Sequence, residues 1–345
     1  MSSSSDPAPP PGKPPLPWRT RLLVSAVSIL HSASLRDDGT VNRSLLSLFD
    51  RTVPPNPVPD PAGVSSSDHA VSDHLRVRLF LPSAADAGDG SQLPLPLVVY
   101  FHGGGFVFHS AASAHFDALC RRLAASIPAA VASVDYRLAP EHKHPAAYDD
   151  GEAALRWAMA GAGGALPTSS SSPVFLAGDS AGGNIAHHVA ARLSNHISGL
   201  VLLQPFFGGE SPTASELRLR GAPFGAPERL AWLWRAFLPP GATRGHEAAD
   251  VPAAISRAGA RVPFPATLVC VGGWDAHQDR QRAYARALRD AAGAEEVRLA
   301  EFPDAGHAFY VFEELADSKR VLAEVAEFVN RRAAEYRRNA RSSHA

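Results

Sequence analysis

The sequence predicts an α/β fold built on one large, mostly parallel sheet with helices on both faces. Short apolar runs alternate with stretches of helical periodicity along most of the 345 residues, which is the pattern of βαβ units. Hydrophobic residues make up 45% of the chain and charged residues 19%, so a substantial core can form. We therefore expect one large folded domain with an insertion rather than two separate domains.

The first 62 residues are expected to precede the main fold. Residues 1–17 are rich in Ser and Pro and are predicted to be a disordered tail, because they have few apolar side chains to offset the entropy of ordering. Apolar residues recur at helical spacing in residues 18–34 and 42–49, which predicts two short helices. We assign residues 18–62 to an N-terminal helical segment.

Seven later segments have the length and apolar content of strands. Arginines alternate along the first of them, so one of its faces is expected to meet water. The expected strands are residues 75–81, 97–101, 130–134, 174–177, 200–203, 266–271 and 297–302. The alternation stops at residues 206–263, where Gly and Pro punctuate a segment containing Trp and Phe. We interpret this segment as a helical insertion over the sheet edge, within a main domain spanning residues 70–338.

A candidate nucleophile lies in the sequence GDSAG at residues 178–182, directly between an expected strand and a helical stretch at residues 184–193. A serine on such a turn adopts strained backbone geometry with its Oγ exposed, and the flanking glycines remove Cβ atoms that would clash. The helix N-terminus behind it favours developing negative charge. We therefore identify Ser180 as a nucleophile, the alternative being an ordinary glycine turn.

A second motif, HGGG at residues 102–105, follows the expected strand that ends at residue 101. Backbone N–H groups of a loop without side chains can approach the oxyanion of an acyl-transfer transition state, and losing one such donor costs about 3 kcal/mol. We expect Gly103, Gly104 and Ala181 to be the donors. A plain glycine turn or a phosphate cradle is the alternative, but neither GxGxxG nor GxxxxGKS is present. His102 is better suited to bracing this loop than to acting as a base.

The hydroxyl of serine needs a base with a pKa near the working pH, which histidine supplies. Of the 15 histidines, His307 lies just beyond the last expected strand, where side chains project over the carboxyl edge of a parallel sheet. His187 and His188 lie on the helix behind Ser180 and are expected to be packing or surface residues. We therefore predict that His307 is the base.

A carboxylate is expected to orient the histidine and to stabilise the imidazolium. Asp275 follows an expected strand and lies between Ser180 and His307 in the chain, an order known for serine triads. Asp279 is the main alternative, although its position suits the N-terminus of a helix, and Asp304 is a weaker one. Asp179 is expected to brace the turn rather than to reach Oγ.

Composition argues against several other classes of function. The formal net charge is −1, so nucleic acid is not an expected partner. No apolar stretch approaches the length of about 20 residues that spans a membrane, and no secretory signal is recognised at the N-terminus. Cys120, Cys270 and the pair His142 and His144 lack companion ligands, so no metal and no cofactor are expected. We expect a soluble protein of the cytoplasm, with the nucleus open as a second location and the oligomeric state undetermined.

Three ordered motifs carry a resemblance to a known family. They are HGGGF at 102–106, DYRLAPE at 135–141 and GDSAGGN at 178–184. With them the chain resembles the hormone-sensitive-lipase-like branch of the α/β-hydrolases, and is similar to the plant carboxylesterases over residues 18–336. The resemblance implies an eight-stranded mixed sheet, one strand more than the sequence indicates, and a cap built from the N-terminal helices and the insertion.

The resemblance also implies an activity. A family member of this kind is a serine carboxylesterase, which hydrolyses short- to medium-chain or aromatic esters through an acyl-enzyme intermediate, so a small-molecule ester is the expected partner. The gibberellin receptors of the same group bind a hormone without turnover and are the alternative. In those receptors the third glycine of HGGG is typically serine and the triad histidine is replaced, whereas this chain has Gly105 and His307.

Overall fold

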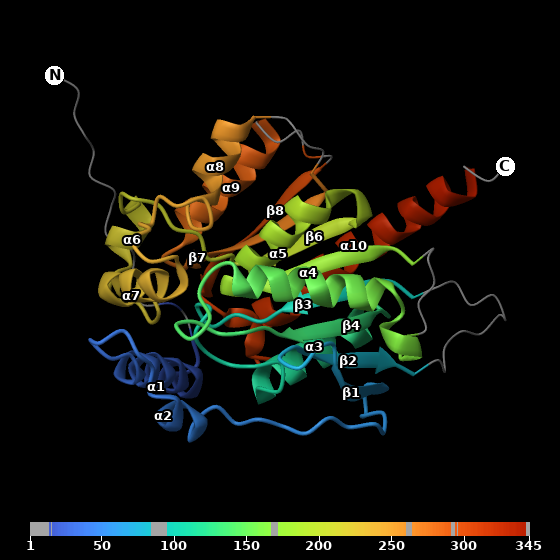
Figure 1. Ribbon diagram of the computed structural model, residues 1–345, viewed down its shortest axis with the longest axis horizontal. Coiled ribbons are helices and arrows are strands. Elements are labelled where there is room, and N and C mark those ends of the chain that lie inside the picture. Colours follow the sequence, from blue (N-terminus) through green and yellow to red (C-terminus); the bar gives the residue numbers. More distant parts are fainter. Residues whose placement is uncertain are drawn as a thin grey trace.

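The computed structural model describes residues 14, 16–83, 95–166, 172–259, 264–290, 294 and 296–342. A sheet of eight strands in the order β1-β2-β4-β3-β5-β6-β7-β8 runs through its centre (Figure 1). The strands are β1 Val64–Ala70, β2 Arg76–Pro82, β3 Leu97–Phe101, β4 Ala130–Asp135, β5 Val174–Asp179, β6 Gly199–Leu203, β7 Thr267–Trp274 and β8 Val297–Gly306. β1 pairs antiparallel with β2 and β2 antiparallel with β4, while the strands from β4 to β8 are parallel. The predicted fold class, a mostly parallel sheet of eight strands, is confirmed.

The strand that the apolar pattern did not indicate is β1. Its sequence is VSSSDHA, and only Val64 and Ser66 are buried. β1 lies at the edge of the sheet, where only one neighbour has to be paired and little apolar surface is required. The eighth strand therefore corresponds to the one implied by the family resemblance.

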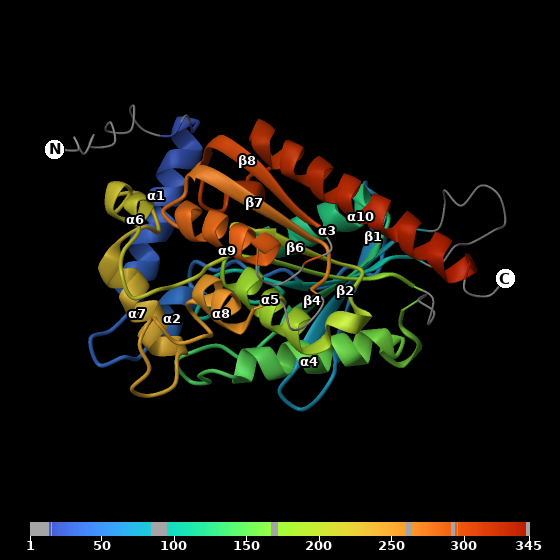
Figure 2. The same cartoon turned by 90° about the horizontal axis from the view of Figure 1, so that it is seen from above.

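Helices cover both faces of the sheet, as predicted. α3 and α10 pack on one face, and α4, α5 and α9 pack on the other (Figure 2). The helices are α1 Trp18–Ser34, α2 Arg43–Ser47, α3 Ala114–Ser126, α4 Ala146–Met159, α5 Ala181–Leu193, α6 Ala214–Arg218, α7 Pro227–Phe237, α8 Val251–Ala258, α9 Gln278–Asp290 and α10 Ala316–Ser342. Each face has its own cluster of buried apolar side chains, so the sheet is the shared wall of two cores.

Helices α1, α2, α6 and α7 gather at one end of the sheet (Figure 1). α1 has the predicted bounds, whereas α2 is shorter than the predicted 42–49 and begins after Asn42, whose side chain accepts a hydrogen bond from the Leu45 N–H. Trp232 of α7 donates to the carbonyl of Arg36, just beyond α1, at 2.9 Å. The N-terminal segment and the insertion therefore lie against each other at this end.

The predicted boundaries at 18–62, 70–338 and 206–263 stay predictions. Apart from residues 14, 16 and 17, the predicted tail at 1–17 lies outside the described residues. No described helix combines the length and the apolar character needed to cross a bilayer.

Candidate active site

Ser180 forms the turn between β5 and α5, with φ 50° and ψ −118°. A positive φ is strained for a residue with a Cβ, and such strain is typical of functional turns. A Cβ at Gly178 would collide with the backbone of Gly182, and one at Gly182 would collide with the carbonyl of Phe101. The backbone N–H of Ser180 donates to the carbonyl of Leu203 at 2.9 Å. The two glycines therefore allow the turn, and the sheet holds it.

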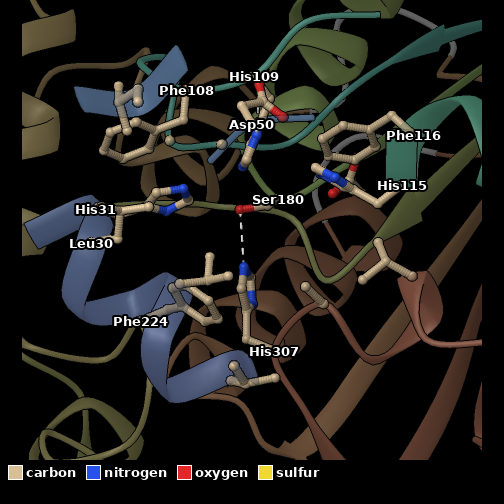
Figure 3. A pocket seen from close by; sticks show the side chains of 18 of the residues that line it. Leu30, His31, Asp50, Phe108, His109, His115, Phe116, Ser180, Phe224 and His307 are labelled. Carbon is tan, nitrogen blue, oxygen red and sulfur yellow. Dashed lines mark hydrogen bonds and ion pairs between the residues drawn. The ribbon is translucent and has the colours of Figure 1, made fainter. Parts of the chain in front are cut away.

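The structure brings Ser180, His307 and Asp275 together from the ends of three strands. His307 Nε2 lies 3.1 Å from Ser180 Oγ (Figure 3). His307 Nδ1 lies 3.0 Å from Asp275 Oδ2. Asp275 directly follows β7 and His307 directly follows β8, so the carboxyl edge of the parallel sheet places both side chains beside the serine turn.

The surroundings of Asp275 keep it ionised although it is fully buried. Its Oδ2 also accepts a hydrogen bond from Gln281 Nε2 at 2.8 Å, and its Oδ1 accepts one from the backbone N–H of His277 at 3.0 Å. Burial alone would raise the pKa of Asp275, but the charge and hydrogen bond of His307 outweigh it and lower the pKa to about 2. For His307 the effect of burial has the opposite sign and would lower the pKa. The charge of Asp275 and its hydrogen bond outweigh burial and raise the pKa of His307. The pair therefore provides a carboxylate and a basic imidazole.

Gln204 is a residue of this site that sequence reasoning missed. Its Nε2 donates to the carbonyl of Gly306 at 3.1 Å, and its Oε1 accepts the backbone N–H of Ala308 at 2.8 Å. One carboxamide thus holds the backbone on both sides of His307. A signal was available, because Gln204 is a lone amide directly after the apolar run of β6, at the carboxyl edge of the sheet.

Asp179 braces the turn, as predicted. Its Oδ1 accepts hydrogen bonds from the Tyr100 hydroxyl at 2.5 Å and the Gly103 N–H at 2.7 Å. Its Oδ2 accepts a hydrogen bond from the Tyr310 hydroxyl at 3.0 Å. Burial raises the pKa of Asp179 to about 6, although these three donors act against the rise.

The contact with Asp179 corrects one predicted oxyanion donor. Because the N–H of Gly103 points at Asp179, it is not available to a substrate at Ser180, and the prediction for Gly103 is wrong in this conformation. Gly104 and Gly105 line the cavity together with Ser180. No described residue accepts a hydrogen bond from the N–H of either glycine. Gly105 therefore takes the place of Gly103 among the candidate donors, beside Gly104 and Ala181.

The two glycines of the loop that line the cavity have positive φ angles. Gly104 has φ 117° and Gly105 has φ 61°. A Cβ at Gly104 would collide with the carbonyl of Phe108, and a Cβ at Gly105 would lie 2.8 Å from a methyl of Leu233. Ala181 is the first residue of α5, where a backbone N–H has no partner within the helix. The N–H groups of Gly104, Gly105 and Ala181 are therefore the candidate donors to an oxygen atom bound at Ser180.

The alternative acid and base candidates lie elsewhere. Asp279 is in the first turn of α9, as expected, and accepts the backbone N–H of Ser215 at 2.7 Å. Asp304 is exposed. His187 is buried on α5, with its Nδ1 2.9 Å from the hydroxyl of Tyr284. None of these contacts the side chain of Ser180 or His307.

A cavity of about 410 Å³ opens beside Ser180 and His307. Its wall is mostly apolar and is shared between the sheet edge and the cap helices. The cap contributes Leu23, Val24, Val27, Leu30 and His31 from α1, and Arg229, Leu230 and Leu233 from α7. His31 and Arg229 are cavity residues that the sequence did not indicate.

Two clusters among the described residues have potential metal ligands within 4.8 Å of one another. One consists of Asp275, His277 and His307 and therefore includes two of the three residues described above. The other consists of Asp50, His109 and His115, and the view of Figure 3 places Asp50 and His109 on the side of Ser180 away from His307. Asp50 already accepts a hydrogen bond from the Ser113 hydroxyl at 2.8 Å. That the site works without a metal stays a prediction.

Comparisons with known proteins agree with the fold. A family model described as the alpha/beta hydrolase fold matches residues 98–311. A gibberellin receptor of Oryza sativa subsp. japonica is 37% identical, over 91% of this chain and 94% of the receptor. A carboxylesterase of Arabidopsis thaliana is 40% identical, over 61% of this chain and 68% of that protein.

A solved structure supports the same conclusion. A hyperthermophilic esterase from the archaeon Pyrobaculum calidifontis superimposes with a TM-score of 0.72 at 27% identity, covering 92% of this chain and 98% of the esterase. The strand order, the serine turn and these matches agree with one another. The chain belongs to the α/β-hydrolase family, in its hormone-sensitive-lipase-like branch.

Proposed function

We propose that the protein is a serine carboxylesterase that hydrolyses short- to medium-chain or aromatic carboxylic esters through an acyl-enzyme intermediate. The observation that carries this proposal is the pair of contacts made by His307, 3.1 Å to Ser180 Oγ and 3.0 Å to Asp275 Oδ2. A base held between a hydroxyl and a buried carboxylate is the arrangement that activates a serine. The similarity to carboxylesterases and esterases supports the same activity.

Acylation begins when Ser180 Oγ attacks the ester carbonyl carbon and His307 Nε2 takes the hydroxyl proton. The carbonyl oxygen becomes an oxyanion, which the N–H groups of Gly104, Gly105 and Ala181 stabilise. The imidazolium is stabilised by Asp275. When the intermediate collapses, the carbon–oxygen bond to the alcohol breaks and His307 returns the proton to the leaving oxygen.

Deacylation repeats these steps with water. His307 takes a proton from the water as its oxygen attacks the acyl carbon, and the same three N–H groups hold the second oxyanion. Collapse breaks the bond to Ser180 Oγ, which regains its proton from His307. Deacylation releases a carboxylic acid and restores the enzyme. The whole reaction therefore consumes one ester and one water and yields an alcohol and an acid.

The size of the cavity suits small acyl groups. Its volume of about 410 Å³ and the aliphatic side chains of α1 and α7 on its wall favour a short to medium chain or one aromatic ring. Long-chain esters are expected to react more slowly, because the cap would have to move to admit them. A chain-length series of 4-nitrophenyl esters measures this preference directly.

The decisive test is the variant Ser180→Ala with 4-nitrophenyl butyrate. Turnover is expected to vanish while the circular-dichroism spectrum stays native. Ser211→Ala is the matched control, because Ser211 is exposed and its carbonyl, which accepts a hydrogen bond from Arg280, is retained. A fluorophosphonate is expected to label the wild type on residues 178–182. Undiminished turnover in Ser180→Ala would refute the proposal.

A second candidate is a small-ligand receptor without turnover. It is favoured by the extent of the match to gibberellin receptors, which covers 91% of this chain, against 61% for the carboxylesterase above. Calorimetry with a gibberellin, run beside the ester assay, separates the two. Tight binding without hydrolysis would favour the receptor, and hydrolysis lost in Ser180→Ala would favour the esterase.

A further inference from the structure

Arg229 is a buried cation in the wall of the same cavity. It lies on α7, is 8% exposed and contributes to the cavity lining beside Ser180 and His307. Within the described parts of the chain, no carboxylate forms an ion pair with its guanidinium. Burial lowers the pKa of Arg229 to about 10, so the group remains charged at neutral pH.

The contacts of this guanidinium are with neutral groups. Nη1 donates to the carbonyl and the hydroxyl of Ser28, both at 3.3 Å, and Nη2 lies 3.1 Å from His31 Nδ1. The rings of Phe224 and Phe108 flank it, with centroids 5.0 and 5.7 Å from Cζ. Its Nε is buried without an acceptor. A buried charge without a counter-ion is costly, and an anion in the cavity would relieve that cost.

The contact with Arg229 also determines the tautomer of His31. A guanidinium has only donors, so His31 Nδ1 must accept and the ring proton resides on Nε2. Burial, followed by the nearby His109 and Arg229, lowers the pKa of His31 to about 2, so the ring is neutral. The ring stacks on Phe108 with centroids 4.2 Å apart and points toward Ser180 (Figure 3). The Nε2–H of His31, on the side of the ring away from Arg229, is therefore a second donor in the lining of the same cavity.

The two acids that line the cavity have donors of their own. Asp179 accepts hydrogen bonds from two tyrosines and Gly103, and Asp50 accepts one from Ser113. Neither forms an ion pair with Arg229. The Phe224 ring lies near both the cation and the site, 6.2 Å from the ring of His307 and 5.0 Å from Arg229 Cζ. One phenyl ring is thus a neighbour of both Arg229 and His307.

We propose that Arg229 and His31 form an anion subsite and that the ester substrates of this protein carry a carboxylate. The carboxylate would accept hydrogen bonds from the guanidinium while the ester carbonyl lies at Ser180, and His31, whose Nδ1 accepts from the same guanidinium, would line the subsite on the side of Ser180. This assignment rests on the proposed esterase function for its substrate, but the subsite itself rests on the buried cation. Half-esters of dicarboxylic acids and esters of carboxyphenols are the chemical class that fits.

The test compares esters that differ only in charge. Mono-4-nitrophenyl adipate and 4-nitrophenyl hexanoate have acyl chains of equal length, and 4-butyryloxybenzoate and 4-butyryloxybenzamide differ on the alcohol side. In Arg229→Met, kcat/KM for the anionic member of at least one pair is expected to fall about tenfold or more relative to its neutral partner, since charge-assisted hydrogen bonds are lost. Arg229→Lys is expected to keep part of the preference.

The control is Arg235→Met, which removes the same charge from an exposed position of the same helix and should leave both ratios unchanged. The neutral esters report on any loosening of α1, because that would slow both members of a pair. Unchanged ratios in Arg229→Met for both pairs would overturn the subsite.

A binding measurement tests the anion subsite separately from the proposed esterase activity. Monoethyl adipate is titrated calorimetrically into Ser180→Ala and into Ser180→Ala with Arg229→Met. Binding weakened about tenfold in the double variant supports the subsite even if the wild type hydrolyses neither ester pair, a result that would refute only the esterase. Equal affinities in the two proteins would overturn the subsite while leaving the esterase intact.

Discussion

Gln204 holds the backbone on both sides of His307. Its amide nitrogen donates to the residue before the histidine and its amide oxygen accepts from the residue after it, at 3.1 and 2.8 Å. Gln204 itself has φ 46°, and its backbone N–H donates to the carbonyl of Cys270 on β7 at 2.9 Å. The base therefore depends on β6 for its position as well as on the loop that carries it.

The variant Gln204→Met tests this relationship. Methionine has a similar length but makes neither hydrogen bond, so the loop of His307 gains freedom and kcat is expected to fall about 10- to 100-fold with a smaller change in KM. Leaving two backbone groups unsatisfied should also lower the free energy of unfolding by about 1–3 kcal/mol. Steady-state kinetics and urea unfolding measure the two effects. Wild-type kcat in this variant would show that the loop holds His307 without help.

The pH profile tests the pair formed by His307 and Asp275. Only neutral His307 accepts the proton of Ser180, so kcat/KM should rise as pH increases through the pKa of His307. Because Asp275 raises that pKa, the rise should be centred above the ordinary value of 6.5. A profile centred well below pH 6 in the wild type would contradict this.

Asp275→Asn removes the charge that raises the pKa of His307. Burial then dominates, so the rise in kcat/KM should move to lower pH, and kcat should fall by about 10²- to 10⁴-fold because the imidazolium loses its stabilising carboxylate. Asp304→Asn is the control, since Asp304 is exposed and its change should leave the profile in place. The measurement is the pH profile of kcat/KM with one ester for the wild type, Asp275→Asn and Asp304→Asn.

Substitution of Asp179 tests whether its carboxylate supports the glycine loop. In Asp179→Ala two tyrosine hydroxyls and the N–H of Gly103 lose their acceptor, which should lower the free energy of unfolding by about 3–5 kcal/mol. Asp179→Asn keeps one acceptor oxygen and should lose less. Urea unfolding is the measurement, with the exposed Asp73 changed to alanine as control. Equal stability of Asp179→Ala and the wild type would contradict a bracing role.

The strands that could be predicted are those buried on both faces. Every residue of β5, for example, is buried, and its first four residues, 174–177, appear in the sequence as an unbroken apolar run. β1 could not be predicted in this way, because its inward face is small and includes Ser66. The difference is physical: a central strand must bury two faces, whereas an edge strand needs little beyond its hydrogen bonds.

Some residues of the candidate site could be predicted from the sequence, and others could not. Ser180 could be located because the strained turn demands glycines at fixed spacing, and His307 and Asp275 because parallel strands end at one edge. The choice between Gly103 and Gly105 could not be made from the sequence, because it depends on which peptide N–H Asp179 binds. Arg229 was missed because a cation on an amphipathic helix normally faces water, whereas here α1 and the rings of Phe108 and Phe224 pack against it.

The edge strand β1 provides the last prediction. Arg78 on β2 is 3% exposed and holds Asp68, its direct partner on β1, through two hydrogen bonds at 2.6 and 2.8 Å. It also donates to Asp117 of α3 at 3.0 Å. These polar contacts, rather than apolar burial, hold β1 against the sheet. Arg78→Met should therefore lower the free energy of unfolding by about 3–5 kcal/mol, as expected when one partner of a buried ion pair is removed.

Arg76→Met is the matched control for that variant. Arg76 lies on the same strand but is exposed, so its change should cost at most about 0.5 kcal/mol. In a double-mutant cycle with Asp68→Asn, the Arg78 variant should show a coupling energy of about 0.5–3 kcal/mol, as residues in direct contact do. Losses of equal size for Arg76→Met and Arg78→Met would mean that pairing along the backbone, and not the arginine, keeps β1 on the sheet.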